Sequence, residues 1–257
     1  MAALAAAGPL LAQERVPPAE RASGQDLIYG GQFSAANLYF SRLAEAYPKD
    51  PVGPTLAASA LIWWGKAREE DAFLADSIDA LLLDGAARAQ AVIDSAADDS
   101  TRARGYFWLG TAIGYRARQA ELLGKWWRAA REAGRMRSAL ERALAYDSTR
   151  VDCLLGLAVY EYGLARAGAL ARLVARIIGL GGGDADRAME MFRRVVSEGD
   201  VARTEGRWIY ANALLREGER GDASLREEGL RMVMQLADEY PENPIFRRLV
   251  GWPADQP

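Results

Sequence analysis

The chain offers few side chains with the chemistry that catalysis requires. Its 257 residues include no histidine, which removes the usual general base, the histidine-dependent nucleophiles and the commonest metal ligand. The lone cysteine, Cys153, lies among leucines, so we expect a buried thiol rather than a reactive one. Aspartate and glutamate carboxylates are therefore the main candidates for catalytic groups.

Two glutamates stand in apolar helical surroundings. Glu161 lies between two tyrosines, and Glu205 precedes a Gly-Arg-Trp sequence. Burial raises the pKa of a carboxyl group and can make it a general acid. Neither glutamate has a second catalytic group at a defined spacing, so we expect both of them, and the mid-helix Asn212, to be hydrogen-bonded structural residues. The sequence therefore predicts a protein without enzymatic activity, cofactor or metal site, with a carboxylate-only enzyme as an alternative.

A glycine-rich loop at residues 181–184 precedes a predicted helix. Such a loop can bind phosphate, but the following Lys and Ser/Thr of the Walker pattern are missing. Asp184 and Asp186 also place negative charge where a phosphate would lie. We therefore expect Asp184 to cap the helix.

Charge is unevenly distributed along the chain. The net charge of −3 gives no general attraction to nucleic acid, which we exclude as a partner. Residues 67–99 carry nine acids against two arginines, and residues 102–142 carry ten basic residues against three glutamates. We expect neighbouring antiparallel helices to neutralise these two blocks. The alternative is a basic surface for an acidic partner or anionic lipid.

Nearly the whole chain after residue 23 has helical periodicity, and strand-like alternation is absent. Glycine, proline and Asp/Ser clusters separate the segments, and short connections predict antiparallel neighbours. The expected helices span residues 25–31, 34–47, 53–66, 69–97, 101–121, 125–146, 150–165, 167–179, 184–198, 202–216 and 223–240.

One phrase occurs twice: Leu-Ala-Glu-Ala-Tyr-Pro-Lys-Asp-Pro at residues 43–51 and Leu-Ala-Asp-Glu-Tyr-Pro-Glu-Asn-Pro at residues 236–244. Each copy ends an amphipathic helix with two prolines, as a stacked helical hairpin ends. Small, aromatic and proline residues keep the matching spacing at Ala36, Phe40 and Pro48, more weakly at Gly229, Val233 and Pro241, and in part at Ala188 and Phe192. The first-helix pattern of an aromatic followed by Leu-Gly is found at Tyr106, Leu109 and Gly110, and its Leu-Gly alone at residues 155–156.

These residues resemble the tetratricopeptide repeat family, although the 34-residue period holds nowhere for two successive repeats. The resemblance implies an all-α, right-handed array of antiparallel helical hairpins in one domain, residues 23–250, between a leader of residues 1–22 and a tail of residues 251–257. It also implies a concave groove, lined by first helices, that binds a protein or peptide segment. The layout is loosely similar to exported bacterial proteins of this family, some of which serve solute transporters.

Aromatic residues are the candidates for this groove. Trp63-Trp64 and Trp126-Trp127 are adjacent pairs whose members diverge by about 100° on a helix, so one of each pair should lie at a helix edge or on the groove. The alternative is that they are packing wedges between long helices. The candidate binding residues are Trp63, Trp64, Tyr106, Tyr115, Arg116 and Tyr160.

Two segments bear on localisation. Met1 to Ala12 is an apolar, alanine-rich run that is similar to the core of a secretory signal peptide but lacks its positive start; the alternative is a disordered tail. We therefore expect export to the periplasm or cell envelope, with a cytoplasmic protein as the alternative. Residues 167–179 form an amphipathic stripe that we expect to cap the core rather than to lie on a membrane.

The sequence thus favours a protein-interaction scaffold as the function. A small-molecule-binding accessory component of a transporter is the alternative, and a closed pocket lined by Trp64, Tyr106 and Tyr160 in place of an open groove would favour it. A second acid beside buried Glu161 or Glu205 would favour the enzyme. The identity of the partner, the pathway and the oligomeric state do not follow from the residues.

Overall fold

The computed structural model describes residues 15–168 and 179–249, together with positions 173, 175, 177 and 251. It confirms an all-α protein: every regular element of the described residues is a helix. The helices are α1 Pro18–Tyr29, α2 Phe33–Ala46, α3 Val52–Arg68, α4 Ala75–Ser95, α5 Asp99–Leu122, α6 Trp126–Tyr146, α7 Cys153–Ala165, α9 Ala185–Glu198, α10 Arg203–Gly218, α11 Ala223–Glu239 and α12 Pro244–Leu249.

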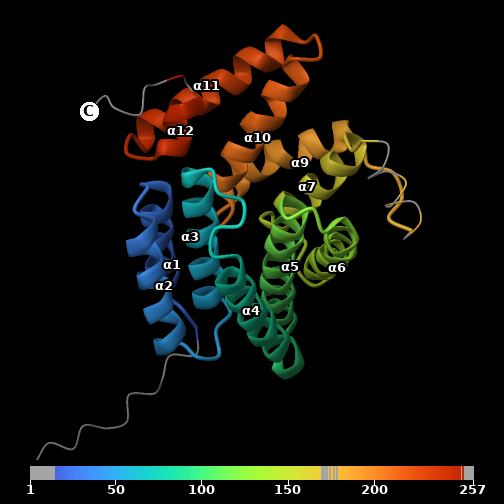
Figure 1. Ribbon diagram of the computed structural model, residues 1–257. Helices are drawn as coiled ribbons and strands as arrows, with labels where there is room; N and C mark the ends of the chain where they lie inside the picture. The colour runs from blue at the N-terminus through green and yellow to red at the C-terminus, as the bar shows by residue number, and fades with distance from the viewer. Residues whose placement is uncertain are drawn as a thin grey trace, which may run out of the picture.

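Consecutive helices pack against each other along the chain. The most extensive contacts join α5 to α6, α2 to α3, α4 to α5 and α10 to α11, and α7 packs on α9 (Figure 1). Because the connections are short, successive helices must lie next to each other. Helices packed in neighbouring pairs are compatible with a helical repeat protein.

The small and aromatic residues singled out in the sequence lie at helix contacts. Ala36 and Phe40 of α2 are completely buried, and a Cβ at Gly24 of α1 would collide with the Phe40 ring. Ala188 and Phe192 of α9 are buried in the same way. Small residues therefore allow two helices to approach closely, and an aromatic ring fills the remaining space.

The repeated sequence segment has the same structural role in both copies. The Asp50 carboxylate accepts the Val52 N–H at 2.9 Å, and the Asn243 amide oxygen accepts the Ile245 N–H at 2.9 Å. Each side chain thereby satisfies a free N–H in the first turn of the next helix. Asp50 and Asn243 are 1% and 0% exposed. The rest of each side chain bonds to a distant part of the chain.

These distant bonds bring the first and last helices together. Asn243 donates to the Tyr29 carbonyl at 2.8 Å, across 214 residues of sequence. Gln25 of α1 donates to the Val201 carbonyl at 2.8 Å, and Arg21 pairs with Asp200 at 2.8 Å. Figure 1 shows α12 beside the ends of α1 and α3, where the Phe246 ring lies 5.7 Å from that of Trp63. The N-terminal and C-terminal helices of the described chain are therefore in direct contact.

Some element boundaries differ from those predicted. Helix α1 begins at Pro18 instead of residue 25, because a proline at the first helical position needs no N–H partner. The helix predicted over residues 69–97 begins later, at Ala75: Glu69 (φ 59°) ends α3 in the left-handed region, and α4 begins only after Leu74 (φ 45°). Helix α12 was not predicted.

Two predicted segments lie largely or wholly outside the described residues. The run from Met1 to Ala12 is one of them, so the predicted signal peptide stays a prediction. The helix predicted over residues 167–179 is the other; of its described positions, Leu173 and Ile177 are exposed and Ala175 is buried. Within the part of the chain that the structure describes, no helix has both the length and the apolar character to cross a membrane.

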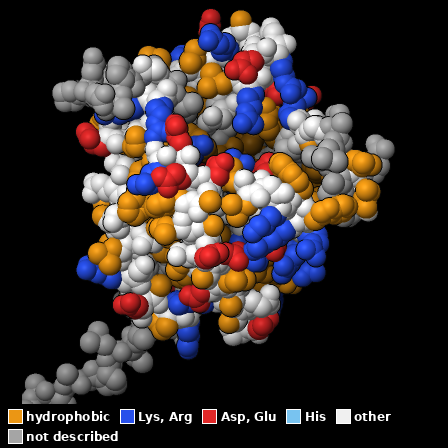
Figure 2. Space-filling model, in the orientation of Figure 1, with side chains coloured by type: hydrophobic (Ala, Val, Ile, Leu, Met, Phe, Trp, Pro, Cys, Tyr) orange, Lys and Arg blue, Asp and Glu red, His pale blue; other side chains and the backbone are white. Residues whose placement is uncertain are grey.

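The acidic and basic blocks partly neutralise each other, as predicted. Asp79 of the acidic block accepts Arg116 of α5 at 2.9 Å and Arg128 of α6 at 2.6 Å. Figure 2 shows acidic and basic side chains interspersed over much of the visible face, with basic side chains gathered over α6. The basic block therefore keeps some unneutralised surface on α6.

Candidate functional site

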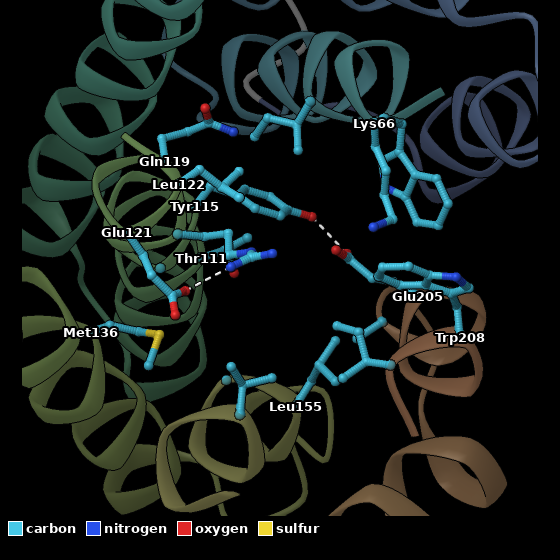
Figure 3. Close-up of a pocket in the computed structure, with 18 of the residues that line it drawn as sticks. Lys66, Thr111, Tyr115, Gln119, Glu121, Leu122, Met136, Leu155, Glu205 and Trp208 are labelled. Atoms are coloured by element: carbon cyan, nitrogen blue, oxygen red, sulfur yellow. Dashed lines mark hydrogen bonds and ion pairs between the residues drawn. The ribbon is translucent and has the colours of Figure 1, made fainter. Parts of the chain in front are cut away.

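A cavity of about 680 Å³ lies in the middle of the helical array. Its walls come from α1, α3, α5, α7 and α10, the first helices of successive neighbouring pairs (Figure 3). Side chains of the second helices, among them Met136 of α6 and Phe192 of α9, close it from behind. Pockets of roughly 300–1,000 Å³ are typical of small-molecule sites.

Aromatic rings form one wall of the cavity. The Trp63 ring lies 5.2 Å from that of Trp208 and 5.5 Å from that of Tyr29, so that α1, α3 and α10 are joined by one aromatic cluster. Trp63 is only 3% exposed. Its packing fixes the wall, and the other rings present apolar surface to the cavity.

A carboxylate and a phenol meet inside the cavity. The Tyr115 hydroxyl of α5 donates to Glu205 Oε2 of α10 at 2.6 Å, and the Ser59 hydroxyl lies 3.3 Å from the Tyr115 oxygen (Figure 3). Burial raises the pKa of Glu205 to about 6, although the Tyr115 hydrogen bond acts in the opposite direction. Burial, followed by the Glu205 charge, raises the pKa values of Tyr115 and Tyr29 well above normal.

Neighbouring glycines position this pair. A Cβ at Gly206 would lie 2.7 Å from Val195 Cγ1, so a glycine there lets α10, which carries Glu205, approach α9 closely. A Cβ at Gly114 would lie 2.8 Å from Met136 Sδ, which places α5 close against α6 beside Tyr115. The Glu205–Tyr115 contact thus depends on two close helix approaches.

Basic side chains surround the cavity mouth. Lys66 of α3, Arg118 of α5 and Arg216 of α10 all line the cavity and are exposed. The Lys66 ammonium lies 4.5 Å from the centre of the Trp208 ring. Burial lowers the pKa of Lys66, and the charges of Arg118 and Arg216 lower it further.

Two of the six predicted binding residues, Trp63 and Tyr115, line this cavity. The other four lie elsewhere among the described residues. The Trp64 ring contacts Phe73 at 5.3 Å, and the Tyr106 ring stacks on Tyr146 at 5.8 Å.

The remaining two predicted residues serve the fold. Arg116 is bound between Asp79 and Glu132, at 2.9 and 3.1 Å. The Tyr160 hydroxyl donates to the Leu180 carbonyl at 2.8 Å. Neither contact leads into the cavity.

The two tryptophan pairs differ. Trp63 is buried and Trp64 is partly buried, as expected for neighbours that diverge around a helix. Trp126 and Trp127, at the start of α6, are 50% and 53% exposed. The second pair therefore does not act as packing wedges.

Several residues examined for chemistry have structural partners. The Glu161 carboxylate accepts the Asp184 N–H at 3.1 Å, and Asp184 caps α9 by accepting the Arg187 N–H, as predicted. Cys153 is completely buried, and burial raises its thiol pKa to about 12. Asn212 donates to the Trp208 carbonyl at 2.7 Å. Over the described residues, no cluster of His, Cys, Asp or Glu is arranged to hold a metal ion.

Sequence reasoning named Glu205 but assigned it to the scaffold, and it did not single out Lys66, Arg216 or Trp208. One signal was available. Glu205 and Trp208 lie three residues apart on one helix face, on a first helix of the kind expected to line the groove. The second acid that would favour an enzyme is not among the hydrogen-bond partners of Glu205 in the described structure, and the absence of enzymatic activity stays a prediction.

Glu205→Gln tests the burial of this carboxyl group. The folded-state pKa of about 6 exceeds the ordinary value of 4.5, so the stability contributed by the neutral acid is present below pH 4.5 and is lost as pH rises through 6. We expect the variant to gain up to about 2 kcal/mol in unfolding free energy over the wild type between pH 4.5 and 7.5. Urea denaturation at several pH values measures this, with exposed Glu227→Gln as the matched control. Parallel curves for Glu205→Gln and wild type would show that Glu205 is not buried.

Comparison with known proteins adds no relationship to this picture. No model of a known protein family matches the chain, and no curated protein matches it.

Proposed function

We propose that this protein binds a small molecule with an apolar body in the cavity between α1, α3, α5, α7 and α10. The cavity of about 680 Å³, lined largely by aromatic and aliphatic side chains from five helices, is the observation that carries the proposal. A concave, mainly apolar space of this size is typical of small-molecule sites.

Closure of the array favours a small ligand over a protein segment. Gln25 and Arg21 of α1 bond to Val201 and Asp200 just before α10, so the two ends of the array are tied together beside the cavity. An extended segment of a partner protein needs a groove that is open along its length, whereas a cavity partly closed by these contacts suits a compact molecule.

The architecture behind the proposal is a degenerate tetratricopeptide-like array of right-handed hairpins. The buried Ala36–Phe40 pair and the position of first helices on the cavity wall support it. Export to the cell envelope and service to a solute transporter extend the same proposal, and they rest on the apolar run at Met1 to Ala12 and on the loose resemblance to exported proteins of this kind.

Titration with 1-decanol, a neutral ten-carbon alcohol, tests the cavity independently of any charge. Burial of a methylene is worth about 0.8 kcal/mol, so we expect a dissociation constant on the order of micromolar by isothermal titration calorimetry. A saturating ligand should also raise the melting temperature, because it binds only the folded state. If folded protein binds neither decanol nor related amphiphiles, the proposal fails and a protein-interaction scaffold becomes the better account.

A further inference from the structure

Two of the three basic side chains at the cavity mouth are outside any ion pair. Lys66 and Arg216 have no carboxylate within ion-pair distance among the described residues. Their neighbour Arg118 pairs with Glu121 at 2.7 Å. Lys66 and Arg216 are therefore the cations that could bind an anionic group of a ligand.

The acids near the mouth are largely engaged elsewhere. Glu70 pairs with Arg68 at 2.7 Å, and Glu69 pairs with Arg248. Asp71 is the exposed acid whose charge reaches Lys66 and partly offsets the neighbouring arginines. Even with Asp71 present, burial and like charges lower the pKa of Lys66, so the ammonium lacks full electrostatic compensation.

The Lys66 side chain also points into the cavity, where a ligand would lie. Figure 3 shows the Lys66 side chain pointing from α3 into the cavity, with its ammonium near the Trp208 ring. A group that binds the ammonium would thus have aromatic surface directly beside it. Glu205 lies on the same face of α10 as Trp208, and one of its carboxylate oxygens is bonded to the Tyr115 hydroxyl (Figure 3).

We propose that the ligand is an organic anion with an apolar body, whose carboxylate is held by Lys66 and Arg216 at the mouth while the apolar part fills the aromatic cavity. This inference rests on the proposed function and adds the charge and the orientation of the ligand. Lys66 and Arg216 would bind the carboxylate through local contacts, and burial of the apolar chain would supply most of the affinity.

Ligands with the same ten-carbon chain and different head groups test the inference. Decanoate, 1-decanol and decylamine share the chain length and differ in charge, and calorimetry below their micelle concentrations gives each dissociation constant. We expect decanoate to bind about tenfold more tightly than decanol and decylamine to bind most weakly, one charge contact being worth about a factor of ten. 2-Naphthoate, a flat aromatic carboxylate, tests whether the apolar body of the ligand is a ring instead of a chain. Tight binding of either decanoate or 2-naphthoate supports the inference.

Lys66→Met removes the charge and keeps the apolar stem over Trp208. We expect this variant to lose about tenfold in decanoate affinity and less than twofold in decanol affinity, whereas Lys66→Arg keeps both. Circular dichroism confirms that each variant is folded.

Two results would overturn the anion while leaving the cavity intact: equal binding of decanoate and decanol in wild type and Lys66→Met, or tightest binding by decylamine. The second would instead mark Glu205 as the group that recognises the head. Failure of all four compounds to bind folded wild type is a different outcome, because it rejects the cavity as a ligand site.

Discussion

A double variant that fills the cavity, Leu155→Trp with Thr111→Trp, should lose binding of ten-carbon ligands almost completely. Leu155 of α7 and Thr111 of α5 line the cavity from different walls (Figure 3). Two added indole rings displace about three to four methylenes of a bound chain. At about 0.8 kcal/mol per methylene, the loss is about 3 kcal/mol, or roughly 100-fold in dissociation constant.

A matched variant separates this effect from the general consequences of added tryptophan. Leu38 of α2 and Leu83 of α4 are 52% and 48% exposed, so Leu38→Trp with Leu83→Trp adds the same rings outside the cavity. We expect this control to bind decanol and decanoate as wild type does. Overpacking costs stability, so urea denaturation checks that the cavity-filling variant is folded at the temperature of the titration. Unchanged decanol binding by that folded variant would place the ligand outside the cavity.

The largest expected loss of stability comes from Asp50→Ala. This side chain is 1% exposed, accepts the Val16 N–H and the Val52 N–H at 2.9 Å each, and forms an ion pair with Arg104. Its removal leaves a buried guanidinium and two amide groups without partners. Loss of one member of a buried ion pair typically costs 3–5 kcal/mol, and we expect about 4 kcal/mol here.

Two comparisons refine the Asp50 prediction. Asp50→Asn keeps an oxygen for the Val52 N–H, as Asn243 does in the second copy of the phrase, and should cost clearly less than Asp50→Ala. Asp76→Ala removes an exposed acid in the first turn of α4 and should change the unfolding free energy by no more than about 0.5 kcal/mol. Chemical denaturation measures all three. A loss of less than 1 kcal/mol for Asp50→Ala would contradict the structural role given to the repeated phrase.

The local pattern of the sequence was enough to predict the helices. Periodicity and prolines locate the described helices from α2 to α11 within about three residues, except for the start of α4, because most are amphipathic or are bounded by strong stop signals. Ala36 and Phe40 were correctly assigned to a helix contact, since the spacing of a small and an aromatic residue has a direct packing consequence.

Errors arose where the decisive contacts are distant in sequence. Helix α1 begins earlier than predicted, at Pro18. The hydrogen bond from the Val16 N–H to the Asp50 carboxylate, across 34 residues, fixes the chain just before this helix. The break between α3 and α4 was predicted, but α4 begins six residues later than expected, after left-handed Glu69 and Leu74, residue types that give no turn signal. Local propensity carries no information on such tertiary choices.

The site was only half predictable for the same reason. Trp63 and Tyr115 could be named from their place on first helices, but the Glu205–Tyr115 contact spans 90 residues and exists only in the tertiary structure. No short-range pattern links Lys66 to Trp208 either. The hydrogen bonds of Asn243 and Gln25 hold the first and last helices together, and this tertiary arrangement brings the cavity side chains into contact.

A crystal structure with 10-bromodecanoate tests the central claim most directly. Anomalous scattering locates the bromine at the end of the chain, and the electron density locates the carboxylate. We predict the bromine inside the cavity among α3, α5, α7 and α10, with the carboxylate within ion-pair distance of the Lys66 ammonium at the mouth. Bromine outside the array, over an empty cavity in protein that binds the ligand in solution, would contradict the account.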